Sequence, residues 1–263
     1  MRLAGARVWL TGASSGIGEA LVPVLAGRGA RLALSARRAE HLEASAAAWR
    51  PRGVDVLVVP HDVTDRAAVR AAAGRIEAAW GGVDVAIFNA GGHTLAPGFD
   101  TRQFVDVMTL NYFAPLYGVE AVLPGMLQRG RGHIAAVASL AGYRGLPTAA
   151  AYGASKAALI HAFESLRFDL APRGIGMTVV NPGYVRTPLT DRNRFRMPFL
   201  MPADRAAELI VRGLERGRRE THFPPVFSWT LKVLRVMPYP LYERIITRAT
   251  AGHRRARGSV ADR

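Results

Sequence analysis

The chain has 263 residues, a formal net charge of +15 and no cysteine. This length is enough for one large domain with its own core, and the lack of cysteine excludes disulfides, thiolate metal sites and a cysteine nucleophile. A composition with 49% hydrophobic and 21% charged residues is that of a globular protein.

The positive charge is concentrated in the last third of the chain. Residues 184–263 hold 17 basic and 7 acidic residues, and therefore carry +10 of the total. Only Lys156 and Lys232 are lysines, so a bias towards arginine accounts for part of the charge. Because no DNA- or RNA-binding motif accompanies the charge, we expect no nucleic-acid partner.

From the residues at the start of the chain we expect no export signal, and no stretch is apolar over the length of a membrane-spanning helix. We therefore expect a cytoplasmic protein, with peripheral contact at the inner face of the membrane as an alternative. No metal is expected.

Short β-branched runs alternate with alanine-rich stretches along most of the chain. Strands are predicted at 7–10, 31–35, 55–59, 83–88, 133–138, 176–180 and 221–223. Helices are predicted between them at 16–28, 39–49, 67–80, 100–128 and 151–172. This alternation indicates a doubly wound α/β fold, a parallel seven-stranded Rossmann-like sheet with helices on both faces. We expect a single domain at 1–218 with a C-terminal extension at 219–263.

A glycine-rich turn follows the first predicted strand and leads directly into the first helix, with the sequence Thr11-Gly-Ala-Ser-Ser-Gly-Ile-Gly18. Glycine permits a tight turn and close approach of the backbone, and a helix N-terminus presents unpaired N–H groups to a pyrophosphate. We therefore expect a dinucleotide here. Contacts are expected from Gly12, Ser14, Ser15, Gly16, Ile17 and Gly18.

The residues after the second predicted strand indicate which dinucleotide binds. NAD is usually held there by an acidic side chain, but this chain has Arg37 and Arg38 instead. A guanidinium pairs with phosphate through two parallel hydrogen bonds, so Arg37 favours NADP(H), and Arg38 is a second candidate.

Two further strand ends are expected to contact the adenosine. Asp62 and Val63 follow the third strand, where Asp62 either accepts from the adenine amino group or caps the next helix. Asn89, Ala90 and Gly91 end the fourth strand and place small residues beside the nucleoside.

Tyr152 and Lys156 lie four residues apart at the start of a predicted alanine-rich helix. This spacing places both side chains on one face of the helix. A nearby ammonium favours the phenolate and lowers the pKa of the tyrosine, as a general acid or base near neutral pH requires. A structural pair on the helix surface is the alternative, although lysine is rare in this chain.

Together these motifs resemble those of the short-chain dehydrogenase/reductase family. The matching segments are the glycine-rich turn, Asp62, Asn89-Ala-Gly91, Asn111, Ser139, Tyr152-Gly-Ala-Ser-Lys156 and Pro182-Gly-Tyr-Val-Arg-Thr187. The resemblance covers residues 3 to about 215 with the motifs in the family's order, and Phe88 replaces an asparagine that is frequent in the family. The chain after Arg218 carries no general family motif.

The resemblance implies a role for each matched residue. Tyr152 would exchange a proton with the substrate oxygen, and Ser139 would hydrogen-bond the same oxygen. Lys156 would hold the nicotinamide ribose and lower the pKa of Tyr152, and Asn111 would hold a water that links Lys156 to solvent. Contacts with the nicotinamide are implied for Pro182, Gly183, Val185 and Thr187.

The activity that the resemblance implies is hydride transfer between NADP(H) and a carbonyl or secondary alcohol. Residues 184–202 would form a lid. Its apolar side chains favour a small hydrophobic substrate, such as a 3-oxoacyl or other lipid-like compound. The alternative, to which we give equal weight, is that these side chains only pack the lid itself. The lid's apolar residues are Phe195, Met197, Phe199, Leu200 and Met201. The alternative function is a non-catalytic dinucleotide-binding regulatory or scaffold protein.

The C-terminal extension has two interpretations. Residues 223–246 mix aromatic and aliphatic side chains with basic ones, and a basic run follows at 253–257. Such a segment lies on an anionic membrane surface, or it packs on its own domain or a partner subunit and helps wall the substrate cleft. We favour packing.

The sequence suggests two kinds of protein partner. An acidic acyl carrier is a candidate because Arg129, Arg131 and Arg173 are expected to flank the catalytic region. The resemblance implies a homodimer or homotetramer formed by the helices at 100–128 and 151–172.

Overall fold

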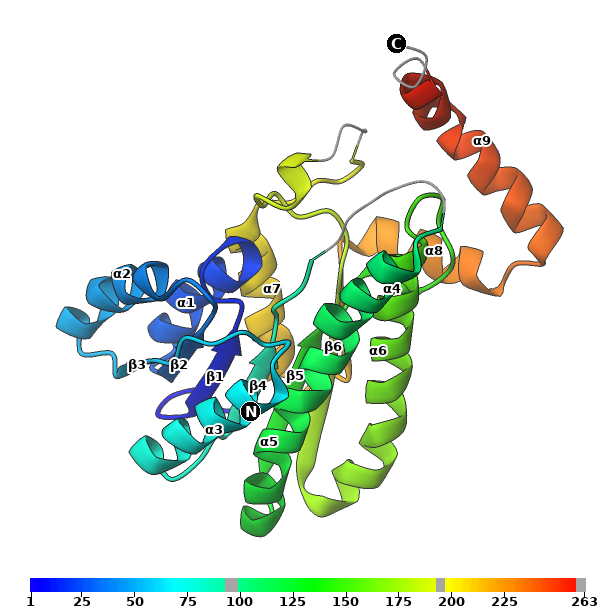
Figure 1. Cartoon of the computed structure of the whole chain (residues 1–263). Coiled ribbons are helices and arrows are strands. Elements are labelled where there is room, and N and C mark those ends of the chain that lie inside the picture. Colours follow the sequence, from blue (N-terminus) through cyan, green and yellow to red (C-terminus); the bar gives the residue numbers. More distant parts are fainter. Residues whose placement is uncertain (93–98, 193–196, 259–263) are drawn as a thin grey trace.

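The computed structural model describes residues 1–92, 99–192 and 197–258. Its sheet has seven parallel strands in the order β3-β2-β1-β4-β5-β6-β7 (Figure 1). The strands are β1 (Arg7–Thr11), β2 (Arg31–Ser35), β3 (Val56–Val58), β4 (Val85–Phe88), β5 (Gly132–Val137), β6 (Ile175–Pro182) and β7 (Glu220–Phe223). The strand order reverses between β1 and β4, which confirms the predicted doubly wound, Rossmann-like sheet.

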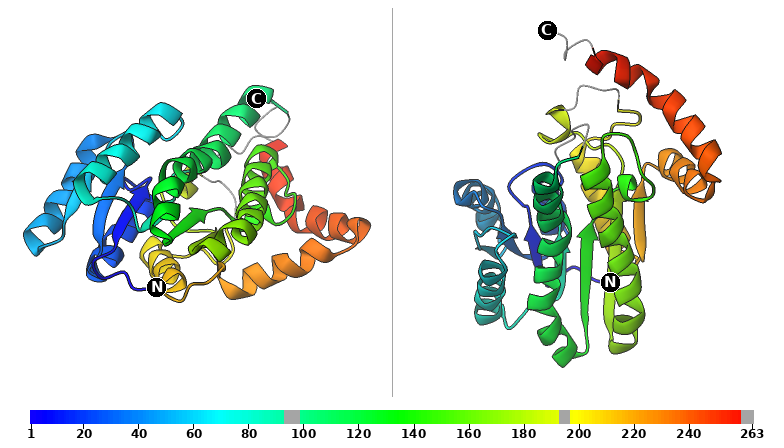
Figure 2. Two further views of the ribbon diagram at one scale, coloured as in Figure 1. Left: turned by 90° about the horizontal axis from the view of Figure 1, so that it is seen from below. Right: turned by 45° about the vertical axis from the view of Figure 1, so that its right-hand side comes forward.

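Helices cover both faces of this sheet (Figure 2). They are α1 (Gly16–Gly27), α2 (Ala39–Trp49), α3 (Arg66–Trp80), α4 (Thr101–Met108), α5 (Ala114–Arg129), α6 (Ala150–Leu170), α7 (Ala203–Glu215), α8 (Pro225–Val236) and α9 (Tyr239–Gly258). One core lies under α1, α2 and α7, and the other lies under α3, α5 and α6.

The strands are apolar on both sides because each side faces a core. On β1, Val8 and Leu10 belong to one core and Trp9 to the other, and all three are fully buried. Each such side chain contributes about 1.5–3 kcal/mol through its burial. The two cores fix the strands rigidly, and with them the loops at their carboxyl ends.

The helix predicted at 100–128 is present as a helical stretch over Thr101–Arg129, but a π-helical turn at Thr109–Phe113 divides it into α4 and α5. In this turn Asn111 is completely buried and its side chain bonds to the backbone of Gly92 and to Ser155. A π turn adds one residue to the helical ladder and so changes the direction in which a side chain points. The interruption therefore serves to turn Asn111 inward.

The described part of the chain beyond residue 202, residues 203–258, contains three helices that were not predicted from the sequence. In α7, the small and aliphatic residues Ala206, Ala207, Ile210 and Leu214 are buried, and their helical spacing is a signal that could have found this helix. β7 extends the sheet to Phe223, five residues into the segment 219–263. α8 then packs beside β7, whereas α9 projects away from the body (Figures 1 and 2).

Among the described residues, no helix combines the length and apolarity needed to cross a bilayer.

His133 on β5 makes stability depend on pH. Burial lowers the pKa of His133 to about 4, whereas an unfolded histidine titrates near 6.5. Between these values the unfolded chain binds the proton and the folded chain does not, so stability is lost as the pH falls from 6.5 to 4. We expect the free energy of unfolding to fall by up to about 3 kcal/mol less in His133→Gln than in the unmodified protein when the pH is lowered from 7 to 4.5. Urea unfolding at the two pH values measures this difference.

His41 on α2 is exposed and provides the control. His41→Gln should show the same pH dependence as the unmodified protein. If His133→Gln loses as much stability on acidification as the other two proteins, the acid sensitivity does not come from His133.

Candidate active site

The glycine-rich turn leaves no room for side chains at two of its glycines. Gly12 has a φ angle of +69°, and a Cβ there would lie 2.8 Å from Ala90 Cα. A Cβ at Gly18 would lie 2.0 Å from Gly12 O. Asn89 Nδ2 donates to the carbonyls of Thr11 and Gly12 at 3.2 and 3.3 Å. The turn is thus held closely against the end of β4.

The first turn of α1 has no side-chain cap from Ser15. The Ser15 side chain therefore does not compete with an anion for the first N–H groups of the helix. The helix dipole adds positive potential at the same place. This arrangement fits the pyrophosphate of a dinucleotide.

The two arginines after β2 have different environments. Arg38 Nη2 donates to Ser14 O at 3.0 Å and to Ser14 Oγ at 3.2 Å, which ties Arg38 to the glycine-rich turn. Arg37 is exposed, and among the described residues no hydrogen bond engages its guanidinium. Hydrogen bonds from Thr64 lower the pKa of Asp62, and the positive charge of Arg37 contributes to the same effect. Arg37 therefore lies close enough to Asp62 to influence it.

Asp62 does not cap the next helix, because Asp65 caps α3 by accepting from Ala67 N and Ala68 N. Asp62 Oδ1 instead accepts from the N and Oγ1 atoms of Thr64 at 2.9 and 2.8 Å. The structure thereby excludes the capping alternative for Asp62 and leaves the adenine contact as a prediction.

A pocket lies beside these strand ends. Two residues predicted to contact adenosine, Val63 and Ala90, line it together with Trp9, Phe88 and Gly118. The structure thus brings the ends of β3 and β4 together as predicted.

Lys156, Asn111 and Gly91 meet at the carboxyl end of β4 and β5. Lys156 and Asn111 are buried, and Lys156 Nζ donates to Val137 O at 2.8 Å. A Cβ at Gly91 would lie 3.1 Å from Asn111 Oδ1 and 3.3 Å from Lys156 Nζ. These contacts bring together three residues that are far apart in the sequence.

Asn111 joins the loop after β4 to α6. Its Nδ2 donates to Gly92 O at 2.8 Å and to Ser155 Oγ at 3.1 Å, and its Oδ1 accepts from Gly92 N at 2.9 Å. Ser155 Oγ in turn donates to Tyr152 O at 2.7 Å. This network holds the helix turn that carries Tyr152, while the water implied for Asn111 stays a prediction.

Tyr152 and Ser139 are paired by a hydrogen bond between their side chains. Ser139 follows β5, where its Oγ also accepts from Ala141 N at 3.1 Å. Lys156 Nζ lies 5.7 Å from the centre of the Tyr152 ring. The structure therefore assembles the predicted serine, tyrosine and lysine.

The predicted direction of the Tyr152 pKa shift is wrong for this structure. Burial raises the pKa of Tyr152, and the hydrogen bond with Ser139 offsets only part of this effect. Burial also lowers the pKa of Lys156 to about 7, so the ammonium is only partly charged near neutral pH. The helical spacing gave the proximity of the two groups but could not show that both are removed from water.

The loop after β6 closes on the glycine-rich turn. Gly183 N donates to Phe223 O at 2.7 Å, and Val185 pairs with Met201. A Cβ at Gly16 would lie 3.0 Å from Thr187 Cγ2. Pro182 ends β6, so the four residues predicted at the nicotinamide follow one another at the carboxyl end of this strand, and Thr187 reaches the glycine-rich turn.

Phe227 of α8 packs against the lid, within the segment 223–246 that was expected from the sequence to help wall the substrate cleft. Phe227 lies 5.9 Å from Tyr184 and 6.1 Å from Phe199, measured between ring centres. No sequence motif indicates that residue 227 returns to the lid. Of the predicted lid residues, Phe195 lies outside the described residues.

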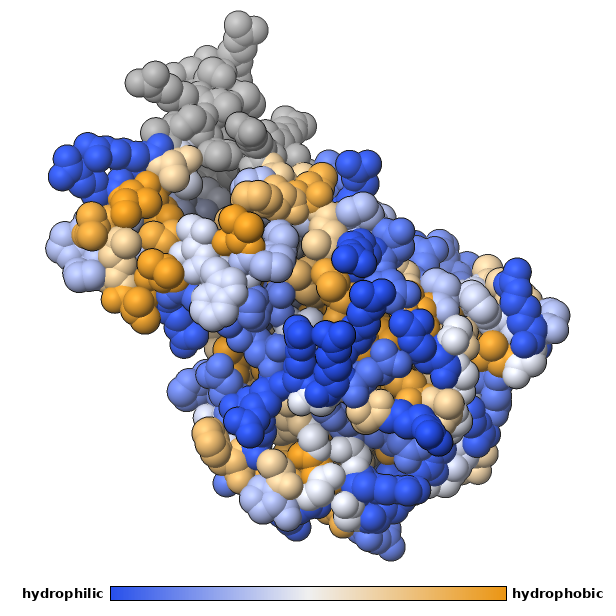
Figure 3. Space-filling view, turned by 180° about the vertical axis from the view of Figure 1, so that it is seen from behind, coloured by the Kyte–Doolittle hydropathy of each residue, from blue (hydrophilic) through white to orange (hydrophobic). Residues whose placement is uncertain are grey.

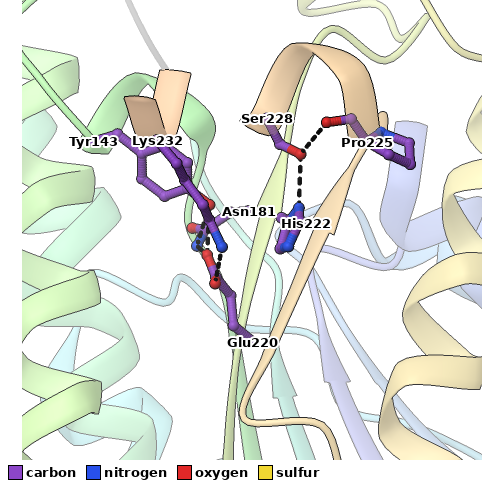
Figure 4. Close-up of polar contacts among 7 residues, drawn as sticks. All are labelled: Tyr143, Asn181, Glu220, His222, Pro225, Ser228 and Lys232. Atoms are coloured by element: carbon purple, nitrogen blue, oxygen red, sulfur yellow. Dashed lines mark hydrogen bonds and ion pairs between the residues drawn. The ribbon is translucent and has the colours of Figure 1, made fainter. Parts of the chain in front are cut away.

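A polar cluster fastens α8 beside this wall (Figure 4). Glu220 on β7 accepts from Tyr143 Oη at 2.5 Å, from Asn181 Nδ2 at 2.8 Å and from Lys232 Nζ at 2.6 Å. Burial raises the pKa of Glu220, but these three bonds outweigh it and the net pKa is lowered. On the same strand, His222 Nδ1 lies 2.7 Å from Ser228 Oγ of α8.

The arginines expected to flank the catalytic region do not do so. Arg129 ends α5, Arg131 precedes β5, and Arg173 precedes β6. They therefore lie at the amino ends of the strands, opposite the site, and Arg129 Nη2 donates to Val83 O there. These arginines are close to β5 and β6 along the chain, but they precede the strands. The amino ends of parallel strands lie on the opposite side of the sheet from the carboxyl ends, where the site is.

The family model for short chain dehydrogenases matches residues 6–197. The chain belongs to the short-chain dehydrogenase/reductase (SDR) family. An uncharacterized oxidoreductase of Myxococcus xanthus is 40% identical over 236 residues, which are 89% of this chain and 93% of that protein. SDR family member 7B of Bos taurus is 40% identical over 191 residues, or 70% of this chain, and the match spans 59% of the bovine protein.

An SDR from Burkholderia phymatum in complex with NAD has a similar structure. Its TM-score is 0.80 at 26% identity, with 88% of this chain and 93% of that chain covered. The present chain is thus an oxidoreductase of the SDR family, for which a nicotinamide dinucleotide is the typical cofactor. The closely packed glycines and the uncapped N-terminus of α1 fit that cofactor.

Gly18→Ala should weaken binding of the nicotinamide dinucleotide by at least about tenfold, because its Cβ would collide with Gly12 O and open the turn. Binding is measured by the change in NADPH fluorescence. Gly27 lies at the other end of α1, where a Cβ would meet nothing within 4 Å, so Gly27→Ala should bind NADPH normally. Equal affinities for the two variants would show that the turn is not the binding cradle.

Proposed function

We propose that the protein is an NADP(H)-dependent reductase of hydrophobic carbonyl compounds, which oxidises the corresponding secondary alcohols in the reverse direction. The proposal is carried by one observation. Tyr152, Ser139 and Lys156 lie close together at the carboxyl ends of the strands, on the side of the sheet where the glycine-rich turn lies. A non-catalytic dinucleotide-binding protein would not need this assembly.

The nicotinamide supplies the hydride when it is bound. Tyr152 holds the proton on its hydroxyl and gives it to the substrate oxygen, so that carbonyl, hydride and proton together yield the alcohol. The raised pKa of Tyr152 keeps the phenol protonated near neutral pH, as a proton donor requires. Ser139 hydrogen-bonds the same oxygen and stabilises the charge that develops on it.

Lys156 is suited to restore the proton of Tyr152. Its pKa of about 7 lets it gain and lose a proton near neutral pH. Its Nζ is held by Val137 O and faces Gly91 and Asn111, next to the place expected for the nicotinamide ribose.

The preference for NADP(H) is assigned to Arg37. Arg38 is tied to Ser14, whereas the exposed guanidinium of Arg37 is available for a phosphate on the adenosine ribose. An acidic residue that would accept from an unmodified ribose is absent at this position in the sequence.

A hydrophobic substrate fits the aromatic wall. Tyr184, Phe199 and Phe227 come from the lid and α8, and more than half of the Phe199 side chain is exposed. Such a wall binds an acyl chain or another lipid-like group through apolar contact. The homo-oligomer and the cytoplasmic location stay predictions.

Tyr152→Phe should remove nearly all reduction of a panel of aldehydes, ketones and 3-oxoacyl thioesters, because the proton donor is lost, while NADPH still binds. NADPH oxidation and NADPH fluorescence measure the two properties. Tyr117→Phe, which changes a tyrosine of α5, should keep both. Substantial turnover by Tyr152→Phe would refute the mechanism, and tight NADPH binding without turnover by the unmodified protein would favour the scaffold function.

Arg37→Ala should lower the affinity for NADPH at least about tenfold and change that for NADH less than about twofold. Arg38→Ala should weaken both dinucleotides, because it releases Ser14 from the turn. Arg52 beyond α2 rests over the Trp49 ring, and Arg52→Ala is the control. Equal losses of NADPH and NADH affinity in Arg37→Ala would remove Arg37 from the phosphate site.

A further inference from the structure

The helix α8 presents apolar residues on two opposite faces. Its inner face buries Ser228 and Leu231 and contacts Tyr184 through Phe227. Its outer face carries four large apolar side chains at helical spacing, each at least 60% exposed. These are Val226, Trp229, Val233 and Val236. A contiguous exposed stripe of this kind marks an interaction surface rather than an ordinary solvated face.

The following helix continues this surface and adds positive charge. Leu241, Arg244, Ile245 and Arg248 are exposed and share one face of α9 by their spacing. Residues 225–258 hold seven basic residues and one acidic residue, Glu243. Apolar side chains gather at this end of the molecule in the space-filling view (Figure 3, upper left).

The two helices are fixed to the body by Arg144, which lies in the loop before α6. Its Nη1 donates to Leu234 O at 2.6 Å and to Met237 O at 2.7 Å, at the end of α8. Its guanidinium also lies 3.9 Å from the centre of the Tyr242 ring, and Tyr242 Oη donates to Gly145 O at 2.5 Å. The outer surface is therefore presented in a defined orientation.

We propose that the outer face of α8 together with α9, here called the amphipathic arm, binds the surface of an anionic lipid bilayer. Valine and tryptophan side chains would enter the boundary between headgroups and acyl chains, and the arginines would contact lipid phosphates. Trp229 and the exposed Tyr239 are residue types that favour this boundary.

Charge distinguishes the bilayer from a second copy of the chain. A symmetric dimer through the arm would bring two surfaces of the same strong positive charge together, which is unfavourable. An anionic bilayer instead complements that charge and covers the apolar stripe.

Bilayer binding would also place the site near the lipid. The inner face of α8 contributes Phe227 to the aromatic wall, so the arm and the substrate cleft share one helix. This consequence rests on the proposed function, whereas binding to the bilayer does not.

The test is sedimentation of the full chain with vesicles of phosphatidylcholine and phosphatidylglycerol, compared with phosphatidylcholine alone. We expect the anionic vesicles to bind at least about tenfold more protein at low salt, and binding to fall at ~0.5 M NaCl. Val233→Ser combined with Val236→Ser, and separately Arg244→Glu with Arg248→Glu, should each reduce binding at least about fivefold.

Phe168 on α6 is 75% exposed but lies outside the arm, so Phe168→Ser is the matched control and should bind like the unmodified protein. NADPH binding by every variant verifies folding. Lack of binding to anionic vesicles, or equal binding by the Val233/Val236 variant, would overturn the proposal. A solution dimer that this variant dissociates, without vesicle binding, would assign the arm to a second copy. No readout requires turnover, so the proposed function is tested separately.

Discussion

The buried amino group of Lys156 organises the site of this protein. Lys156 is removed from water and keeps a hydrogen bond from its Nζ to Val137 O at the end of β5. Loss of that partner would leave an unpaired buried donor, which is costly, so α6 must stay in register with β5. Tyr152 lies one turn earlier on α6 and Ser139 two residues beyond Val137, and their pairing follows from the same register.

Local chemistry made the dinucleotide end of the site predictable. The glycines of the turn, the asparagine after β4 and the strands around them follow from strand-to-turn-to-helix patterns that depend on neighbouring residues. Burial was not predictable in this way. The π-helical turn that directs Asn111 inward, and the raised pKa of Tyr152, both depend on helices packed from distant parts of the chain.

The substrate end was predicted least well because it is assembled by long-range contacts. Phe227 reaches the lid only because β7 and the cluster around Glu220 fix α8 at the sheet edge. The wrong prediction that Arg129 flanks the catalytic region had the same origin. Distance along the chain does not tell whether a residue lies at the amino or the carboxyl ends of the strands. One helix, α8, thus contacts Tyr184 and Phe199 on one face and contributes its other face to the amphipathic arm.

Hydride transfer to a hydrophobic carbonyl is tested most directly with NADPH that carries deuterium at the transferable position of the nicotinamide. The protein is incubated with this cofactor and a long-chain 3-oxoacyl thioester or ketone, and the product is analysed by mass spectrometry. We expect an alcohol with one deuterium on the former carbonyl carbon. NADPH binding without any alcohol across the carbonyl panel, or an alcohol without the label, would contradict the assignment of this site as a carbonyl reductase.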